Sequence, residues 1–191
     1  ETFARLRTSF DRQAQFTAAS FNSADIGNPP TPGSATLVSG GYEVTSAGTN
    51  IAGASDQFFF NYQSLAGNFD LKVRGAALSL SDVWAKAGLM ARETLTANSR
   101  FAMAVATPSA SGAYFLARST TGGNATPSGG FPVNYPNTWL RLARVGGTFT
   151  GYASLDGQTW IKLNSVTLSS PNAVFHVGMA VTGATTNNQT A

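Results

Sequence analysis

The fold is decided by the stretch Val83-Trp84-Ala85-Lys86-Ala87-Gly88-Leu89-Met90-Ala91-Arg92-Glu93-Thr94-Leu95. Read with the two-residue period of a β-strand, it has one side of small apolar residues, namely Ala85, Ala87, Leu89 and Ala91. The other side carries larger and polar residues, namely Trp84, Lys86, Met90 and Arg92. Many of these residue types also favour helices, but Gly88 would interrupt a helix and the neighbouring segments alternate in the same way. We therefore predict a strand.

The same alternation recurs along the chain, as in Phe69-Asp70-Leu71-Lys72-Val73-Arg74 and again around Trp139 and Phe175. Asp156-Gly157 is a strong signal for a hairpin turn. About a dozen short strands and no convincing central helix predict an all-β sandwich of two antiparallel sheets. We expect one sandwich domain over residues 16–191, preceded by an N-terminal arm or linker over 1–15 in which a short amphipathic helix is the alternative.

The composition indicates an exported domain. Only 11% of the 191 residues are charged, and there are 20 Gly, 8 Pro and no Cys. Disulfides and thiolate metal sites are thereby excluded. The net charge of +3 is too small to indicate nucleic acid, and no apolar stretch is long enough to cross a bilayer. We predict a secreted or cell-surface bacterial domain with no nucleic-acid partner and no membrane insertion.

Four segments carry a resemblance to a known family. They read Ala54-Ser55-Asp56-Gln57-Phe58-Phe59-Phe60-Asn61-Tyr62-Gln63, then Trp84 to Glu93, then Trp139-Leu140-Arg141-Leu142, then Gly151 to Trp160. In this order they resemble the DUF1349-type branch of the concanavalin A-like lectin/glucanase superfamily, which is related to laminin-G-like jelly rolls. The resemblance implies a jelly-roll sandwich with one concave sheet, in secreted or surface proteins often linked to polysaccharides. It also implies a final strand after Val181, which we expect to be truncated or supplied by another chain.

Catalysis is not the first expectation. The Glu-x-Asp-x-x-Glu strand of the superfamily's glucanases is missing, and the chain contains only Glu1, Glu43 and Glu93. We expect Glu93 to pair with Arg92. A polysaccharide lyase would need a base beside an arginine that neutralises a uronate, and the residues that could supply this are Lys86, Arg92, Tyr114 and His176.

The candidate ligand-binding residues are the aromatic and basic residues expected on exposed sheet faces: Trp84, Lys86, Arg92, Tyr114, Arg118, Trp139, Arg141 and His176. Aromatic rings stack on the apolar faces of sugars and arginines donate to their hydroxyl groups, so this set predicts a glycan surface. The surplus of basic residues favours an acidic glycan. Two structural interpretations compete: Trp84 and Trp139 form a second small core, or the arginines pair with Asp70, Asp82 and Glu93.

No cofactor is predicted, although a structural calcium ion is compatible with Asp25, Asp56 and Asp70. We expect Trp160 to pack beneath the hairpin turn at Asp156-Gly157. The predicted function is a non-catalytic carbohydrate-binding module of a larger protein. It would bind a polysaccharide through the concave sheet and the loop from Thr120 to Asn137, with the other domains of that protein as further partners. The alternatives are a structural or protein-interaction (adhesion) module and, third, a polysaccharide lyase or hydrolase.

Overall fold

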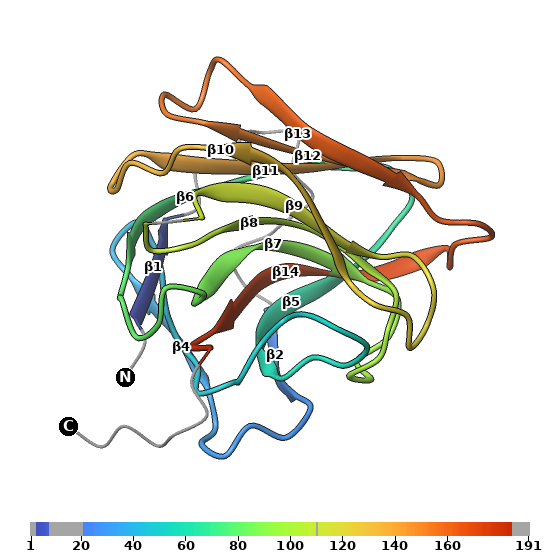
Figure 1. The fold of residues 1–191 in the computed structure, drawn as a ribbon, viewed down its shortest axis with the longest axis horizontal. Helices are drawn as coiled ribbons and strands as arrows, with labels where there is room; N and C mark the ends of the chain where they lie inside the picture. The colour runs from blue at the N-terminus through green and yellow to red at the C-terminus, as the bar shows by residue number, and fades with distance from the viewer. Residues whose placement is uncertain (1–2, 8–20, 110, 185–191) are drawn as a thin grey trace.

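The computed structural model describes residues 3–7, 21–109 and 111–184, with side chains from residue 21 onward. Within these residues it contains strands and turns but no helix, and the strands form two seven-stranded antiparallel sheets that pack face to face (Figure 1). This confirms the predicted all-β jelly-roll sandwich. The described residues accordingly contain no helix of the length and apolar character needed to cross a membrane.

Sheet A has the strand order β13-β12-β11-β6-β1-β4-β3. Its strands are β13 (Ile161–Thr167), β12 (Thr148–Ser154), β11 (Thr138–Val145), β6 (Phe69–Leu78), β1 (Phe3–Arg7), β4 (Gly41–Thr45) and β3 (Ser34–Val38). Sheet B has the order β10-β9-β8-β7-β14-β5-β2. Its strands are β10 (Thr126–Phe131), β9 (Ala113–Arg118), β8 (Phe101–Ala106), β7 (Lys86–Arg92), β14 (Val174–Thr182), β5 (Phe58–Ala66) and β2 (Asn22–Ile26).

The opening stretch forms β7, in the middle of sheet B between β8 and β14. Its Ala87, Leu89 and Ala91 belong to the core between the sheets, whereas Met90 lies in a second apolar cluster on the opposite face. Gly88 is required by close packing, because a Cβ built there would lie 2.1 Å from the backbone oxygen of Ala104 on β8. Every residue of β7 is buried, so the strand was predicted correctly but the exposure of its second face was not.

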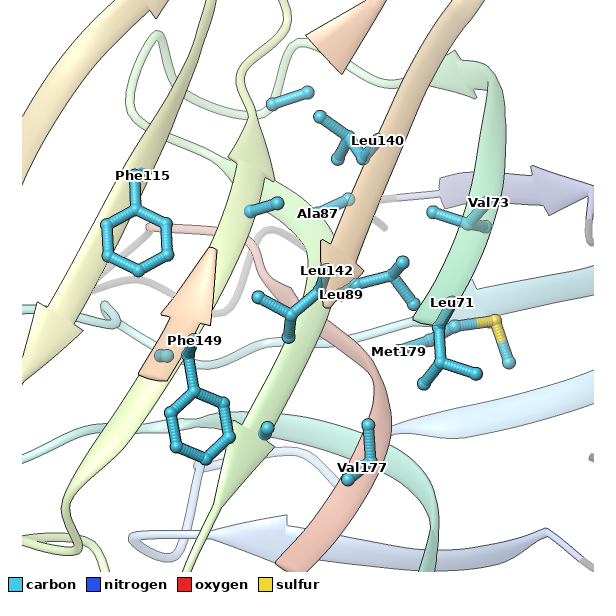
Figure 2. Close-up of a cluster of buried hydrophobic side chains, with 14 of the residues drawn as sticks. Leu71, Val73, Ala87, Leu89, Phe115, Leu140, Leu142, Phe149, Val177 and Met179 are labelled. Atoms are coloured by element: carbon cyan, nitrogen blue, oxygen red, sulfur yellow. The ribbon is translucent and has the colours of Figure 1, made fainter. Parts of the chain in front are cut away.

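The main core lies between the two sheets. Figure 2 shows Leu71 and Val73 of β6 and Leu140 and Leu142 of β11 facing Leu89, Val177 and Met179 of sheet B. These side chains come from strands in which buried and more exposed positions alternate, as in β6 and β11. Burying each such side chain contributes about 1.5–3 kcal/mol, which explains why alternation in the sequence determines this layer.

A second apolar cluster covers the outer face of sheet B. Its strand residues include Phe58, Phe60, Phe101 and Met103, and further members come from three segments that lie over the sheet. These segments, 46–57, 93–99 and 119–125, contribute Ile51, Leu95, Ala97 and Ala125. We call them the cover loops. They bury the face that the sequence analysis expected to be open.

The N-terminal residues contribute a strand to sheet A. Phe3–Arg7 form β1, which pairs with β4 on one side and β6 on the other. These five residues therefore belong to the sandwich and not to a separate arm, linker or helix, because they pair with a strand on each side. Residues 8–15 lie outside the described residues. Residues 185–191, where we expected the chain to stop short of a final strand, also lie outside them, so that expectation stays a prediction.

Candidate functional site

The eight residues predicted to bind ligand lie on two opposite sides of the sandwich. Trp139 and Arg141 belong to β11 of sheet A. The others belong to sheet B or lie next to it: Trp84, Lys86, Arg92, Tyr114, Arg118 and His176. The eight residues therefore do not form one common binding surface.

Arg92 and Arg118 are fully buried and form an ion cluster with Asp56. Arg118 donates from Nη2 to Asp56 Oδ1 at 2.7 Å and from Nη1 to Oδ2 at 2.8 Å, and Arg92 Nη1 reaches Oδ2 at 3.4 Å. All three side chains have 0% exposure. The expectation that these arginines face a ligand is wrong, because the cover loops close over them.

Backbone carbonyl groups of the cover loops complete this cluster. Arg118 donates to Gly53 at 2.8 Å, to Gly123 at 2.9 Å and to Ser99 at 3.1 Å, one carbonyl from each of the three loops. Arg92 donates to the carbonyls of Thr94 and Thr96 in the segment 93–99. The guanidinium group of Arg118 lies 5.0 Å from the centre of the Phe101 ring, and that of Arg92 lies 5.1 Å from the centre of the Phe58 ring. The cluster therefore ties the cover loops to sheet B.

Tyr114 and His176 are poorly placed to act as the base of a lyase, and Lys86 is enclosed, with only 4% of the residue exposed. Burial raises the pKa of Tyr114 to about 12, so its hydroxyl stays protonated at neutral pH. His176 is half-buried, and its Nδ1 lies 3.1 Å from the hydroxyl of Ser64. Burial, and then the charge of Arg92, lower the pKa of His176. Because Arg92 is enclosed, it does not present the open uronate-binding cation that the lyase hypothesis required beside these groups.

Trp84 is the exposed member of the sheet B set. It precedes β7 with 54% of its surface accessible, in the same connection as the exposed Leu80 and Val83. The backbone around it is held in place, because Asp82 Oδ1 accepts a hydrogen bond from Trp84 N at 2.7 Å and Lys86 Nζ donates to Trp84 O at 2.9 Å. Trp84 is thus as exposed as a binding residue should be, but the other aromatic residues of the predicted set do not lie beside it.

The outer face of sheet A is the better candidate site. Three aromatic and three basic residues meet there, and we call this set the aromatic–cation face: Lys72, Arg74, Trp139, Arg141, Tyr152 and Trp160. The strand register explains the grouping. Trp139 lies opposite Arg74 of β6, and Arg141 lies between Lys72 of β6 and Tyr152 of β12. Each of the six residues is partly exposed.

Each ring of this face has a cation over it. Arg141 lies 4.8 Å from the centre of the Tyr152 ring and 5.9 Å from that of Trp160. Lys72 is 5.7 Å from the Trp160 ring, and Arg74 is 5.8 Å from the Trp139 ring. Asp70 holds Arg141 in place by accepting its Nε–H at 2.7 Å and a second N–H of the same group. This hydrogen-bonded pair raises the pKa of Arg141, so its charge is permanent.

The hairpin turn beside the face packs on a different tryptophan from the one predicted. Gly157, at φ +71°, approaches Trp139 so closely that an added Cβ would lie 2.9 Å from its ring. The turn is fixed by Asp156 Oδ1, which accepts hydrogen bonds from the backbone N–H groups of Gln158 and Thr159 at 2.8 and 2.7 Å. Trp160 instead extends over the sheet towards Lys72 and Arg141. Its ring therefore remains part of the face.

Sequence reasoning missed four members of this face: Lys72, Arg74, Tyr152 and Trp160. Lys72 and Arg74 were visible as the polar half of an alternating strand, and Tyr152 alternates in the same way along β12. Which strands lie next to each other was the missing information. β6 precedes β11 by about 60 residues in the sequence, yet the two strands are adjacent in sheet A.

The carboxylates named as calcium ligands do not share a site. Asp25 accepts the backbone N–H of Gly33, Asp56 pairs with two arginines, and Asp70 pairs with Arg141. In the part of the chain that the structure describes, no three residues of the metal-binding types gather in one place. Glu93 pairs with Arg100 at 2.6 Å rather than with Arg92, which corrects the predicted ion pair.

Comparison with known proteins identifies the fold. No protein-family model and no curated protein matches this chain. A functionally unknown protein from Saccharomyces cerevisiae superposes with a TM-score of 0.65 at 16% identity, over 85% of this chain and 86% of that one. The carbohydrate-binding module CBM66 from Bacillus subtilis gives 0.54 at 16% identity, over 80% of this chain and 85% of the module.

A third similar structure is a mutant of the GH43 protein BlXynB from Bacillus licheniformis. It gives a TM-score of 0.56 at 12% identity, and the match covers 81% of this chain but only 32% of that protein. At these identities the likeness establishes a shared β-sandwich fold.

Proposed function

We propose that this chain is a non-catalytic carbohydrate-binding module of a secreted or cell-surface bacterial protein, and that it binds polysaccharide through the aromatic–cation face. The observation that carries the proposal is the group of three partly exposed rings, Trp139, Tyr152 and Trp160, on one open sheet face. Rings of this kind stack on the apolar faces of sugars, and the guanidinium and ammonium groups beside them donate hydrogen bonds to hydroxyl or carboxylate oxygens.

The charge of the face favours an acidic glycan. Lys72, Arg74 and Arg141 supply three positive charges, and Asp70 supplies the negative charge that pairs with Arg141. A polymer with carboxylate groups would meet this positive potential while its rings stack on the aromatic side chains. The likeness to CBM66 agrees with a binding role, and the four sequence segments described above support membership in the DUF1349-type branch.

The test is a polysaccharide array that includes neutral and acidic glycans, followed by tryptophan fluorescence with each hit. Trp160→Ala should weaken the response, because it deletes the ring that Arg141 lies over. Trp84→Ala is the matched control, since it removes an exposed tryptophan on the other side of the sandwich. No binding to any glycan, or a loss of binding with Trp84→Ala alone, would contradict the proposal.

A structural or protein-interaction module is the second candidate. It is favoured by exposed apolar side chains outside the proposed site, namely Leu37 and Val38 on β3, which ends sheet A, and Leu80, Val83 and Trp84 before β7. Edge strands and apolar loop tips are common protein contacts. A chain that binds no glycan but retains a partner from the same larger protein would support this alternative. The third candidate, a polysaccharide lyase, requires release of an unsaturated uronate product, which ultraviolet absorbance would detect.

A further inference from the structure

Lys86 is a buried lysine whose described hydrogen bonds both go to uncharged oxygens. Only 4% of the residue is exposed. Its Nζ donates to the side-chain oxygen of Asn50 at 2.6 Å and to the backbone oxygen of Trp84 at 2.9 Å. Burying an ammonium group without a carboxylate in contact is unfavourable, so burial disfavours the charged form of Lys86.

The surroundings increase the fraction of Lys86 that is a neutral amine. Burial lowers the pKa of Lys86 to about 8, and the charge of Asp82 only partly opposes this effect. At pH 7 about one Lys86 side chain in ten is then neutral, far more than for a lysine in water. A neutral amine is a nucleophile, whereas an ammonium ion is not.

Asn50 is held next to that amine by its own backbone. It lies in the cover loop 46–57 and forms a bridge with Gln57, in which Asn50 O accepts the Gln57 N–H at 2.7 Å. Lys86 begins β7, opposite Thr182 of β14, and Thr182 Oγ1 donates to Gly48 O of the same loop at 2.6 Å. The amine and the side-chain amide are therefore fixed together by the fold on both sides.

We propose that Lys86 and Asn50 become joined by an intramolecular isopeptide bond. Nζ of the neutral lysine attacks Cγ of Asn50 and forms a new C–N bond. The bond from Cγ to Nδ2 breaks, a proton moves from Nζ to the departing nitrogen, and ammonia leaves. No oxidant, cofactor or second substrate is needed, and the product is a secondary amide.

Such a bond would be a covalent cross-link between two distant segments of the chain, as a disulfide is in other proteins. The sequence contains no cysteine, so its sandwich has no disulfide cross-link. The new amide would link the cover loop 46–57 to the central strand of sheet B, which holds the second apolar cluster closed. A cross-link of this type stabilises the fold mainly by restricting the unfolded chain.

Intact mass spectrometry of the full 191-residue chain tests the proposal. The protein should weigh about 17 Da less than its sequence requires, because one ammonia is lost in the reaction. After denaturation, trypsin should fail to cut after Lys86, and tandem spectra should show the segments containing Asn50 and Lys86 as one branched peptide.

Lys86→Arg and Asn50→Ala are the control variants, and each should have its full calculated mass. A wild-type chain of full mass that trypsin cuts after Lys86 would overturn the proposal. So would a deficit of the same size that persists in Lys86→Arg, since the ammonia would then have been lost elsewhere. The result is independent of glycan binding, because neither residue belongs to the aromatic–cation face.

Discussion

Arg118 and Asp56 form a two-bond ion pair at 2.7 and 2.8 Å with neither side chain exposed, although 61 residues separate them in the sequence. The pair joins the end of β9 to the cover loop 46–57. It also explains why Arg118, which was expected to contact a ligand, lies in the interior.

Removing Arg118 should destabilise the fold strongly. Arg118→Ala leaves Asp56 with only the longer contact to Arg92 and frees carbonyls of all three cover loops. We expect a loss of about 3–5 kcal/mol in the free energy of unfolding, as for other broken buried ion pairs. Urea denaturation measures it. If the alanine variant does not fold, Arg118→Lys should still show a clear loss, because one ammonium group cannot replace the planar set of donors.

Asp70→Asn is the control for that measurement. It weakens the ion pair between Asp70, which is 44% exposed, and Arg141, which is 26% exposed. Because both side chains are partly in solvent, the free energy of unfolding should fall by less than about 1 kcal/mol. Equal losses for the buried and the exposed pair would show that the Asp56 cluster does not hold the cover loops.

Trp160→Ala and Arg141→Ala should each weaken glycan binding about tenfold or more, which corresponds to about 1.4 kcal/mol. The two side chains lie together, with Arg141 5.9 Å from the Trp160 ring, so their effects should be less than additive. Isothermal titration calorimetry with the best glycan from the array gives the values. Fully additive losses would indicate that ring and cation contact the ligand separately.

Salt should weaken binding to an acidic glycan. The positive charges of Lys72, Arg74 and Arg141 are partly exposed and are screened over about 10 Å at 0.1 M salt. Affinity measured from low to high sodium chloride should therefore fall, whereas binding by ring stacking alone would be nearly unchanged. A flat salt dependence would point to a neutral polysaccharide on the same face.

Gly157→Ala should perturb the turn beside the face. The residue has φ +71°, and its new Cβ would lie 2.9 Å from the Trp139 ring, so we expect a loss of about 2 kcal/mol and a changed tryptophan emission. Gly146→Ala is the matched control, with φ +59° and open space around the added atom. It should show only the backbone cost, about 1 kcal/mol. Identical effects would mean that the contact with Trp139 contributes nothing.

Stability should fall as the pH drops below about 6.5 because of His176. Burial and the charge of Arg92 lower its pKa in the folded chain below the ordinary value of 6.5. As the pH falls, His176 is therefore protonated in the unfolded chain before it is protonated in the folded chain. The unfolded population rises over this range, until the pH reaches the pKa of His176 in the folded chain. Above pH 6.5, His176 is neutral in both the folded and the unfolded chain, and its contribution to the free energy of unfolding is fully present. Thermal unfolding of the wild type and of His176→Gln should diverge only in the acidic window.

Most strands and the two-sheet class of the fold could be predicted, because the relevant signal is local. In β6, β7 and β11 alternate side chains point to opposite faces, so Leu71, Leu89 and Leu142 are recognisable as core residues from their immediate neighbours. The tight turn at Asp156-Gly157 was predicted for the same reason. β1 was missed, and Phe3–Arg7 obtain their place in sheet A only by pairing with strands far along the chain.

The sequence by itself thus determined the two-sheet architecture and named Trp139 and Arg141, two members of the face where we place the site. Only the tertiary structure decided which sheet face stays open. The alternating pattern marks both outer faces as polar or aromatic, but Ile51, Leu95 and Ala97 fold over sheet B, and Asp56 neutralises the arginines beneath them. On the outer face of sheet A, the short turn at Gly157 lies against Trp139, and the six residues of the aromatic–cation face stay partly exposed. Burial of one face by distant loops is a long-range effect, and no local pattern encodes it.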